Sequence, residues 1–564
     1  MPLKNNLRVI LWVLFGIALI VNVQLFTREF PAPPRTLALS APAPAAPSLG
    51  STAPIMGATA DSTVAAGGVS APAQAGLSAE VTSGTSAPTV QIRTDVLDLT
   101  VSLQGGNLVG AQLLAYPAAK NQPDHPVELL QDSPPVFELQ GGLAGMAGGQ
   151  SGPTHLTRYT SSVTSATLAA GQNQVSVPLM WTDGEGLTVV KTLTLHRNSY
   201  AIDVDYQISN AGSTPFAFAP YDQIVRLNEP LHRSYFNPSS YAYKGPAYFD
   251  GARFEKLNYL KGEKLDASVR GGYLAALQPY FFAAILPPQD AAFQYTSQSQ
   301  DQEFLLKVVG QMQTVAPGAM ATVHDTLYVG PKQQSRLDAV HPALDRVADY
   351  GRLTVLAKPL FWLLEGVHRV IGNWGFAIII ATLLIKLVLY PLSETSYRSM
   401  ARMKALSPRL NALRETYKDD REKLARAQME LYKKEKINPV AGCLPMLVQV
   451  PVFFAWYWVL RDSVEMRQAP FILWINDLSA RDPWFVLPAA MAVAMFIQTK
   501  YFAAPASDPA QQRVMMFMPL AMSATFAFFP AGLVLYYITN TVLGILQQWS
   551  INRRVEAAQA RATR

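Results

Sequence analysis

The stretch IIIATLLIKLVLYPL (residues 378–392) is apolar almost throughout, yet it carries Lys386 in its second half. Placing a charged side chain at the centre of a bilayer costs about 2.5–3.5 kcal/mol on insertion scales. Lys386 stands six residues before Leu392, about 9 Å along a helix, so its long stem could carry the ammonium to the nearer interface. Such snorkelling explains why a lysine is tolerated. The functional alternative is a hydrated cavity open to the cytoplasm.

This stretch and four further apolar runs predict five membrane-spanning helices. At ~1.5 Å per residue they reach roughly 24–32 Å, about the thickness of a hydrocarbon core. The runs are Trp374–Leu392, Val440–Leu460, Trp484–Tyr501, Val514–Phe529 and Ala531–Trp549. Aromatic residues towards their ends are typical of interfacial belts, namely Trp374, Tyr390, Trp456, Trp458, Trp484 and Trp549. A sixth run, Val9–Phe26, has no small-residue cleavage site behind it, so we expect an uncleaved transmembrane anchor over residues 1–30.

The composition suits a membrane chain with a sizeable soluble part. Of the 564 residues, 49% are hydrophobic and only 15% are charged, with a net charge of +6. These values exclude a disordered protein, and basic residues concentrated beside apolar segments argue against a nucleic-acid binder. Cys443 is the only cysteine, so neither an intramolecular disulfide nor a CxxC site is possible. We expect no metal and no cofactor.

Loop charges predict the orientation. Between Ser393 and Lys436 there are twelve Lys or Arg against seven Asp or Glu, and residues 552–564 hold four against one. Both segments therefore belong in the cytoplasm by the positive-inside rule. With six spans, both termini lie in the cytoplasm and residues 90–345 lie on the outer side.

Residues 90–345 are expected to form an all-β domain. In VLDLTVSL (96–103) Leu97, Leu99, Val101 and Leu103 alternate with Val96, Asp98, Thr100 and Ser102, a period of two typical of a strand with one buried face. LTVVKTLTL (187–195) and YAIDVDYQIS (200–209) repeat this pattern around a turn. About 250 residues of this kind predict a β-sandwich. We interpret the scattered histidines as ordinary surface or core residues without catalytic function, namely His196, His232 and His324.

Three connecting segments have patterns of their own. Residues 31–89 are mostly Pro, Ala, Ser, Gly and Thr, which predicts a disordered linker. Residues 352–373 place leucines on one helix face and charges off it, which predicts an amphipathic interfacial helix; a linker helix packed on the β-domain is the alternative. Residues 393–438 predict an antiparallel helical hairpin with a turn and N-cap at KDD (418–420), either a solvated coiled coil or a docking surface. The remaining segments are the second span (374–392), spans three to six (439–550) and a basic cytoplasmic tail (551–564).

The five spans contain no Asp, Glu or His, so Lys386 has no carboxylate partner within them. Thr382 lies one turn before it on the same helix face. Further polar groups at membrane depth are Gln449, Thr499, Ser523, Thr539, Asn540 and Thr541. Each of these alone is more often a contact between helices, but together with Lys386 they indicate a pocket for polar or acidic segments. An intramembrane protease is excluded because Ser/His or paired Asp are missing, and we expect no enzyme.

Three motifs are more specific, namely INPVAGCLPMLVQVPVFFAWYWVL (437–460), RQAPFILWINDLSARDP (467–483) and FPAGLVLYYITN (529–540). They resemble the YidC/Oxa/Alb family of membrane-protein insertases. GGYLAALQPYFFAAILP (271–287) and YVGPK (328–332) resemble its Gram-negative branch, in which a large periplasmic β-domain precedes a five-helix core.

This resemblance implies an insertase and chaperone for nascent membrane proteins in the bacterial inner membrane, acting as a monomer, alone or beside the Sec translocon. In the family a basic residue, usually arginine, occupies a hydrophilic groove that is open to the cytoplasm and to lipid, and Lys386 falls on that position. A lysine keeps the charge but loses the planar donor set of arginine. Thr382, Tyr536 and Tyr537 resemble substrate-contacting positions, beside the polar Gln449 and Asn540. The hairpin and tail resemble the parts that meet the ribosome and the signal-recognition machinery.

Two other functional classes remain open. A polytopic secondary transporter also places a charge at membrane depth, but usually shows repeated halves with broken helices, and the five unequal spans show no such repeat. A membrane-anchored periplasmic assembly factor would act through the β-domain. Deleting roughly residues 90–330 separates these classes, because an insertase should largely survive the deletion.

Overall fold

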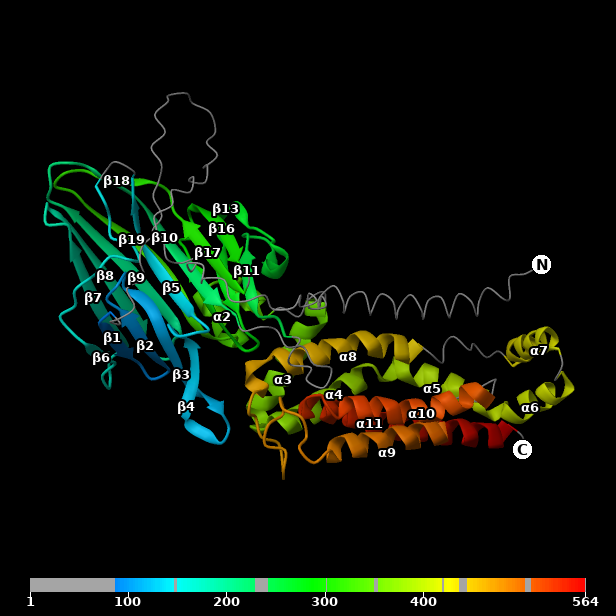
Figure 1. Ribbon diagram of the computed structural model, residues 1–564. Coiled ribbons are helices and arrows are strands. Elements are labelled where there is room, and N and C mark those ends of the chain that lie inside the picture. Colours follow the sequence, from blue (N-terminus) through cyan, green and yellow to red (C-terminus); the bar gives the residue numbers. More distant parts are fainter. Residues whose placement is uncertain are drawn as a thin grey trace, which may run out of the picture. The chain divides into compact units, whose positions relative to one another are not determined.

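The computed structural model describes residues 87–146, 150–228, 242–300, 302–348, 353–417, 420–435, 444–502 and 509–562. They divide into two compact units (Figure 1). The β-unit comprises residues up to 112, 128–278 and 283–328, and the helical unit comprises 113–127, 279–282 and the residues from 329 onwards. The expected anchor, residues 31–86 of the expected linker, His232 and Cys443 lie outside the described residues.

Two large sheets, built mainly by antiparallel pairing, make up the β-fold. The larger sheet contains β1 (Thr89–Arg93), β2 (Leu97–Ser102), β3 (Asn107–Ala119), β4 (Gln122–Leu130), β5 (Phe137–Gly145), β6 (Ser165–Thr167), β10 (Phe216–Leu227), β13 (Asp266–Arg270), β16 (Ala292–Gln300), β17 (Glu303–Val309) and β18 (Gln313–Val315). The smaller sheet contains β7 (Gln174–Thr182), β8 (Leu187–His196), β9 (Ala201–Asn210), β11 (Gly245–Phe249), β12 (Phe254–Lys256), β14 (Tyr273–Leu277), β15 (Phe281–Leu286) and β19 (Met320–Pro331). Strands far apart in sequence neighbour one another, as in β17–β10–β5 and β15–β19–β9. The sandwich expected from the alternating pattern is present.

The alternation within β8 shows how the sequence forms this core. Every second residue from Leu187 to Leu195 is buried and its neighbours are half-buried. β8 pairs with β9 through a turn at residues 197–200, as the sequence predicts. Between Val189 and Leu193, however, the buried position is occupied by Lys191.

Lys191 belongs to a buried ionic cluster with Asp222 on β10 and Asp325 on β19. Its ammonium donates hydrogen bonds to the carbonyl oxygens of Gly105 and Gly106, at 3.1 and 3.0 Å. Burial raises the pKa of Asp222 to about 6 although Lys191 lowers it, and burial and the neighbouring Asp222 raise the pKa of Asp325 well above its usual range. A hydrogen bond between the two carboxyl groups lowers the pKa of Asp222 and raises that of Asp325, and the charge of Lys191 lowers the pKa of both.

The turn at Gly105 requires glycine. Its φ of +72° lies in the left-handed region, and a Cβ atom there would stand 2.2 Å from the carbonyl oxygen of His155. The turn thereby brings two carbonyl groups over the Lys191 ammonium.

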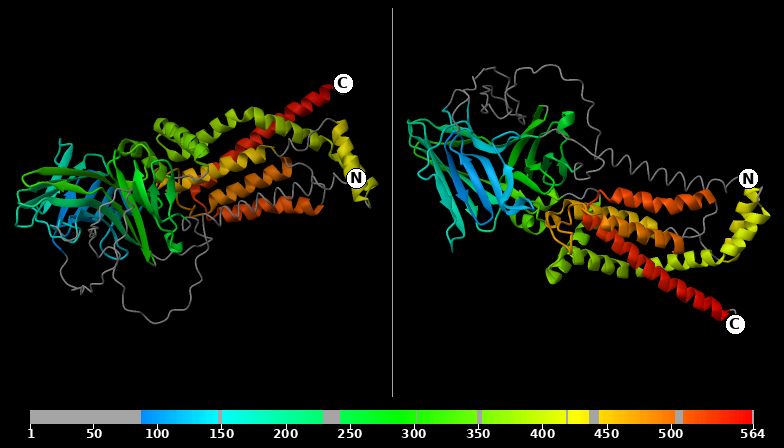
Figure 2. Two further views of the ribbon diagram at one scale, coloured as in Figure 1. Left: turned by 90° about the horizontal axis from the view of Figure 1, so that it is seen from above. Right: turned by 60° about the horizontal axis from the view of Figure 1, so that its bottom comes forward.

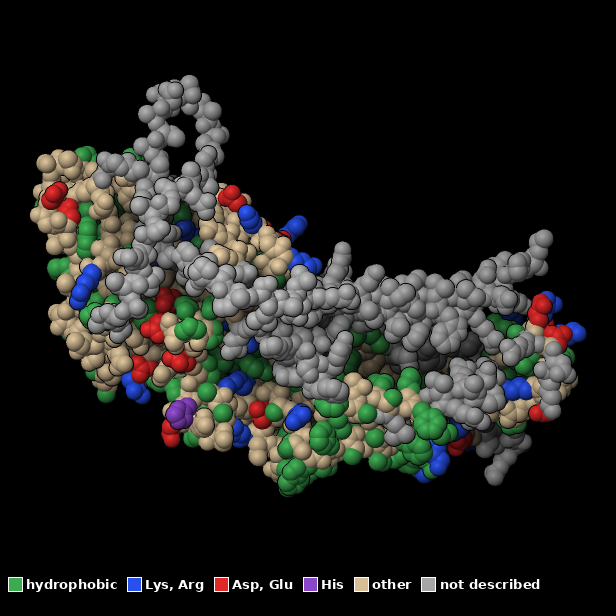
Figure 3. Space-filling model, in the orientation of Figure 1, with side chains coloured by type: hydrophobic (Ala, Val, Ile, Leu, Met, Phe, Trp, Pro, Cys, Tyr) green, Lys and Arg blue, Asp and Glu red, His purple; other side chains and the backbone are tan. Residues whose placement is uncertain are grey.

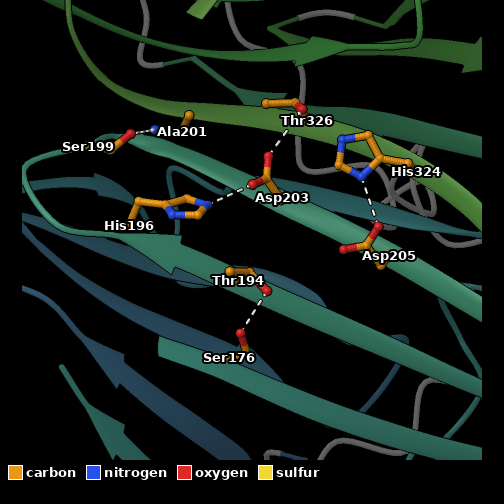
Figure 4. A network of polar contacts seen from close by, with 9 residues as sticks. All are labelled: Ser176, Thr194, His196, Ser199, Ala201, Asp203, Asp205, His324 and Thr326. Atoms are coloured by element: carbon orange, nitrogen blue, oxygen red, sulfur yellow. Dashed lines mark hydrogen bonds and ion pairs between the residues drawn. The ribbon is translucent and has the colours of Figure 1, made fainter. Parts of the chain in front are cut away.

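A second polar network lies on the exposed face of the smaller sheet (Figure 4). His196 Nε2 contacts Asp203 at 2.8 Å, and His324 Nδ1 contacts Asp205 at 2.8 Å. Both histidines are partly exposed, which agrees with the interpretation of ordinary surface residues. They are scattered in the sequence but lie on one face of neighbouring strands.

The helical unit consists of α2 (Gln334–Val340), α3 (Thr354–Ile371), α4 (Trp374–Val388), α5 (Tyr390–Ala405), α6 (Ser407–Thr416), α7 (Arg421–Lys434), α8 (Leu444–Asp462), α9 (Val486–Phe502), α10 (Pro509–Phe526) and α11 (Ala531–Ala562). α11 packs against α4, α5, α8 and α9, and its C-terminal end projects away from them in both views of Figure 2. Hydrophobic side chains gather on the surface of this unit near α9 (Figure 3). Those exposed on α9 include Val493, Phe496 and Ile497.

The second predicted span is not one straight helix. α4 ends at Val388, and α5 begins at Tyr390 after a bend of 72°. Pro391 explains the break, because proline has no N–H for the helix ladder and its ring clashes with the preceding turn. Among the described residues no single helix has the length and apolar composition expected of a membrane span, but the bent α4–α5 pair together meets these criteria.

α3 packs on α4 and α8 rather than lying free. Its buried face is formed by Ala357, Phe361 and Leu364, whereas Trp362 and Val370 are 74% and 87% exposed. Of the leucines expected on the apolar face, Leu364 is buried and Leu360 and Leu363 pack against the same core, which also contains Phe361.

The segment after α5 forms the predicted pair of helices, α6 and α7, which contact each other. Asp420 caps α7 by accepting a hydrogen bond from Lys423 N at 2.9 Å, so the predicted N-cap is confirmed. Leu431 packs against the buried Met403 and Leu406.

Candidate functional site

A pocket opens between α4, α5, α8 and α11, and it contains five of the six residues that the sequence predicts for the site. It encloses about 350 Å³, including the space at its mouth. The lining residues are Thr382, Ile385, Lys386, Leu389, Ser393, Gln449, Val452, Trp456, Tyr536 and Asn540. Helical spacing accounts for the contribution of α4, since Thr382 and Lys386 lie four residues apart on one face, and Leu389 follows directly after the helix.

Thr382 is fixed in the wall of the pocket. Its side chain is 2% exposed, and its hydroxyl donates to the carbonyl oxygen of Ile378 at 2.6 Å. The same face of α4 is buried through Ala377 and Ala381. Small residues let α11 approach closely here, which places Tyr536 and Asn540 opposite Thr382.

Gln449 and Tyr536 join two walls of the pocket. Gln449 Nε2 donates to Tyr536 Oη at 2.8 Å. The Tyr536 ring stacks on Trp456, with ring centroids 5.1 Å apart and an angle of 22° between the planes. The resulting wall is partly polar and partly aromatic.

Trp456 differs from its predicted place in an interfacial belt. It is 0% exposed, so the belt interpretation is wrong for this residue. Its indole Nε1–H is buried and has no hydrogen-bond acceptor among the described residues. α8 is enclosed by α3 and α11 at this level, which turns a tryptophan near the end of an apolar run into a core residue.

Tyr537 does not line the pocket. Its ring packs against Phe453 and Phe526, with centroid distances of 6.0 and 5.2 Å. Successive helix residues point about 100° apart, so Tyr536 and Tyr537 face different neighbours.

Five lining residues were not predicted from the sequence; three are aliphatic, and the other two are Ser393 and Trp456. Ser393 lies on α5, beyond the bend that follows α4, so helical spacing from Lys386 does not predict its place in the pocket. For Trp456 the sequence holds no signal either, because a buried and an interfacial tryptophan look alike in an apolar run.

The pocket offers one cation, hydroxyl groups, amides and a phenol. It can therefore bind polar chain segments and attract an anionic group. Its lining residues include no nucleophile beside a general base, and in the described chain no group of three or more His, Cys, Asp or Glu could hold a metal ion. The chemistry available is recognition of a polar ligand.

Known proteins match this chain over nearly its whole described length. Residues 366–559 match the family model described as 60Kd inner membrane protein, and residues 89–363 match the YidC periplasmic domain. The membrane protein insertase YidC of Thioalkalivibrio sulfidiphilus is 44% identical over 513 residues, which cover 87% of this chain and 91% of that protein. That of Bordetella petrii is 46% identical over 486 residues and covers 84% of each. A solved structure of an active YidC insertase, with the first transmembrane domain resolved, is 18% identical at a TM-score of 0.35 and covers 83% of this chain and 93% of that one.

These matches confirm the resemblance carried by the three motifs. The two family models leave only residues 364–365 unmatched between 89 and 559. The chain therefore belongs to the YidC family of membrane protein insertases, inner membrane proteins with a periplasmic domain.

Proposed function

We propose that this chain inserts nascent membrane proteins into the bacterial inner membrane by receiving their polar segments in the pocket that contains Lys386. The observation that carries this proposal is a lysine inside an apolar helix, at a polar pocket, without a carboxylate partner among the described residues. A charge in such surroundings is costly, and charges at membrane depth usually mark a substrate pathway.

The pocket lowers the barrier for a polar segment in two ways. Water and the side chains of Gln449, Tyr536 and Asn540 replace hydrogen bonds that the segment loses on leaving the cytoplasm. The Lys386 ammonium attracts acidic residues in the segment across a medium that screens charge less than water does. A polar segment then crosses a thinner apolar layer than the full bilayer.

The outer face of α4 offers a path for the apolar part of a substrate. Leu387 and Val388 are 57% and 78% exposed, and Leu383 and Leu384 are about 40% exposed. These residues face away from the buried Thr382 side. An apolar substrate helix slides along this face into lipid, and burial of about 20 apolar residues supplies the free energy without nucleotide hydrolysis.

The proposed topology has six spans with both termini in the cytoplasm, and the β-unit lies in the periplasm. Its support is the positive charge of the hairpin and of the tail. In this orientation α6, α7 and the C-terminal end of α11 face the ribosome and the signal-recognition machinery. The chain works alone or beside the Sec translocon, as a monomer.

Site-specific photocrosslinking tests the pocket directly. A photoreactive amino acid at Gln449 or Asn540 should crosslink to a ribosome-held nascent membrane protein, but not to a soluble nascent chain. The matched control is Val493, which is 59% exposed on α9 and does not line the pocket. Equal crosslinking from Val493 and from the two pocket positions would contradict the proposed path.

The role of the charge has its own test. Lys386→Met should slow the insertion of substrates with an acidic polar segment, and Lys386→Arg should preserve it. If Lys386→Met inserts every substrate at the wild-type rate, the charge is dispensable and its proposed role fails.

A further inference from the structure

The ammonium group of Lys386 lies close to the backbone of α11 at Gly544. A Cβ atom added at Gly544 would stand 3.3 Å from Lys386 Nζ, and 3.7 Å from both Gln498 Nε2 and Tyr397 Oη. Three polar side-chain ends from α4, α9 and α5 therefore surround one point on a fourth helix. The space at this point exists because residue 544 has no side chain.

These surroundings are polar but uncharged. Gly544 is buried, and Gln498 and Tyr397 are half-buried. The phenol oxygen of Tyr397 can accept a hydrogen bond, and so can the Gln498 amide oxygen after a half-turn of the amide. Such neutral partners reduce the cost of a partly buried charge without neutralising it. The positive charge thus stays available to an anionic group in the pocket.

We propose that Gly544 is a positioning residue for Lys386. Its missing side chain gives the ammonium a place between four helices, where the neutral ends of Tyr397 and Gln498 border the same space. This inference rests on the proposed function of the Lys386 charge. In this arrangement Lys386 does not snorkel freely, and its charge has a defined location.

A glycine in a helix can also serve close packing, and this alternative predicts a different result. A packing role would disturb the protein whether or not residue 386 is charged. A positioning role acts only through Lys386, so its loss has no further effect once the charge is gone. A double-mutant cycle separates the two cases.

The experiment measures initial insertion rates of a substrate with an acidic polar segment into vesicles that contain the full-length protein. The variants are Gly544→Leu, Lys386→Met and the combination of both. We expect Gly544→Leu to slow insertion roughly fivefold, equivalent to about 1 kcal/mol. In the Lys386→Met background the same substitution should change the rate by less than about twofold.

Three controls make the result decisive. Val542→Leu enlarges an exposed residue two positions away on α11 and should leave the rate unchanged. A substrate whose acidic residues are neutralised should respond weakly to Gly544→Leu. Gln498→Leu removes a neutral partner without filling the space, and it should show the same dependence on Lys386 if Gly544→Leu does not reach the membrane.

The outcomes distinguish this inference from the proposed function. Equal slowing by Gly544→Leu in both backgrounds would assign Gly544 to helix packing and overturn the inference alone. A wild-type rate for Lys386→Met would remove the proposed role of the charge, and the inference with it.

Discussion

Replacing Lys191 with methionine keeps the length of the side chain but removes the positive charge from the buried cluster with Asp222 and Asp325. Removing one partner of a buried ion pair typically costs about 3–5 kcal/mol. The carbonyl groups of Gly105 and Gly106 also lose their hydrogen-bond donor. We therefore expect the β-unit of Lys191→Met to be destabilised by about this amount near neutral pH.

The loss should depend on pH in a direction fixed by Asp222. Burial raises the pKa of this carboxyl to about 6 even beside Lys191, so without the lysine the pKa lies higher still. Between about pH 6 and pH 7.5 the folded variant then holds a proton that the unfolded chain has released. Relative to the wild-type protein, its free energy of unfolding falls as the pH rises, by about 0.7 kcal/mol per unit at pH 6 and about 1.4 at pH 7.5, because the wild-type carboxyl loses its proton over this range; the total is about 1.7 kcal/mol.

Other groups around the cluster do not share this dependence. The pKa of each nearby phenol is raised, chiefly by burial, so these side chains stay neutral over the whole range; they are Tyr159, Tyr206, Tyr221 and Tyr295. Asp205 on the outer face of β9 acts on Asp325 in both proteins. The titration of Asp222 therefore differs between wild type and variant. Burial also lowers the pKa of Lys191 to about 8, so near the top of this range the wild-type lysine begins to release its proton, which makes the variant fall further behind in the same direction.

Hydrogen exchange of the full-length protein in lipid nanodiscs measures this effect. Opening free energies for peptides of β8 and β10, corrected for intrinsic exchange at each pH, give the local stability. The matched control is Lys264→Met, an exposed lysine of the same unit, which should follow the wild-type curve. Parallel curves for wild type and Lys191→Met between about pH 6 and pH 7.5 would refute the reasoning.

Two further predictions concern the helical unit. Gly375→Ala should lower the unfolding temperature of the detergent-solubilised protein, because the new Cβ would lie 2.0 Å from the Phe471 ring and overpacking costs about 1–3 kcal/mol. Gly366→Ala, at a helix position open to solvent, should stabilise the protein by about 1 kcal/mol and raise its unfolding temperature. A shift of the unfolding temperature in the same direction for both variants would contradict this account. Asp482→Ala should destabilise the folded protein by about 1–3 kcal/mol. This buried carboxylate accepts hydrogen bonds from Trp474 Nε1 at 2.9 Å, from one backbone N–H just before α9 and from one in its first turn. Faster hydrogen exchange in the first turn of α9 would verify the second prediction, and unchanged exchange would refute it.

Local periodicity made much of the site predictable. The spacing of four between Thr382 and Lys386 fixes their common face on any helix, so their meeting in one pocket follows from the sequence. Tyr537 does not line the pocket for the same geometric reason, since its neighbour Tyr536 occupies the pocket side. The helix boundary near Leu389 was missed because the apolar pattern runs on past the bend, and the proline that causes it was read as part of the span.

The ionic cluster could not be predicted, because it depends on strand order. The alternation in β8 predicts that Lys191 points inwards, but the residues next to it in the sequence do not identify its partner. Asp222 and Asp325 come from strands that pairing over long sequence distances brings to the same place. A single sequence does not specify such pairing, so the pattern gives the direction of a side chain but not its contacts.

The bend between α4 and α5 lies close to Lys386, and α5 extends from it towards α6 and α7. Leu389 stands one turn after Lys386, and α5 extends 16 residues beyond the bend, or about 24 Å. A rotation of about 10° at Leu389 therefore displaces the far end of α5 by about 4 Å, given this length. A tilt at this joint would therefore displace α6 and α7, which follow α5 directly, much further than the residues beside Lys386.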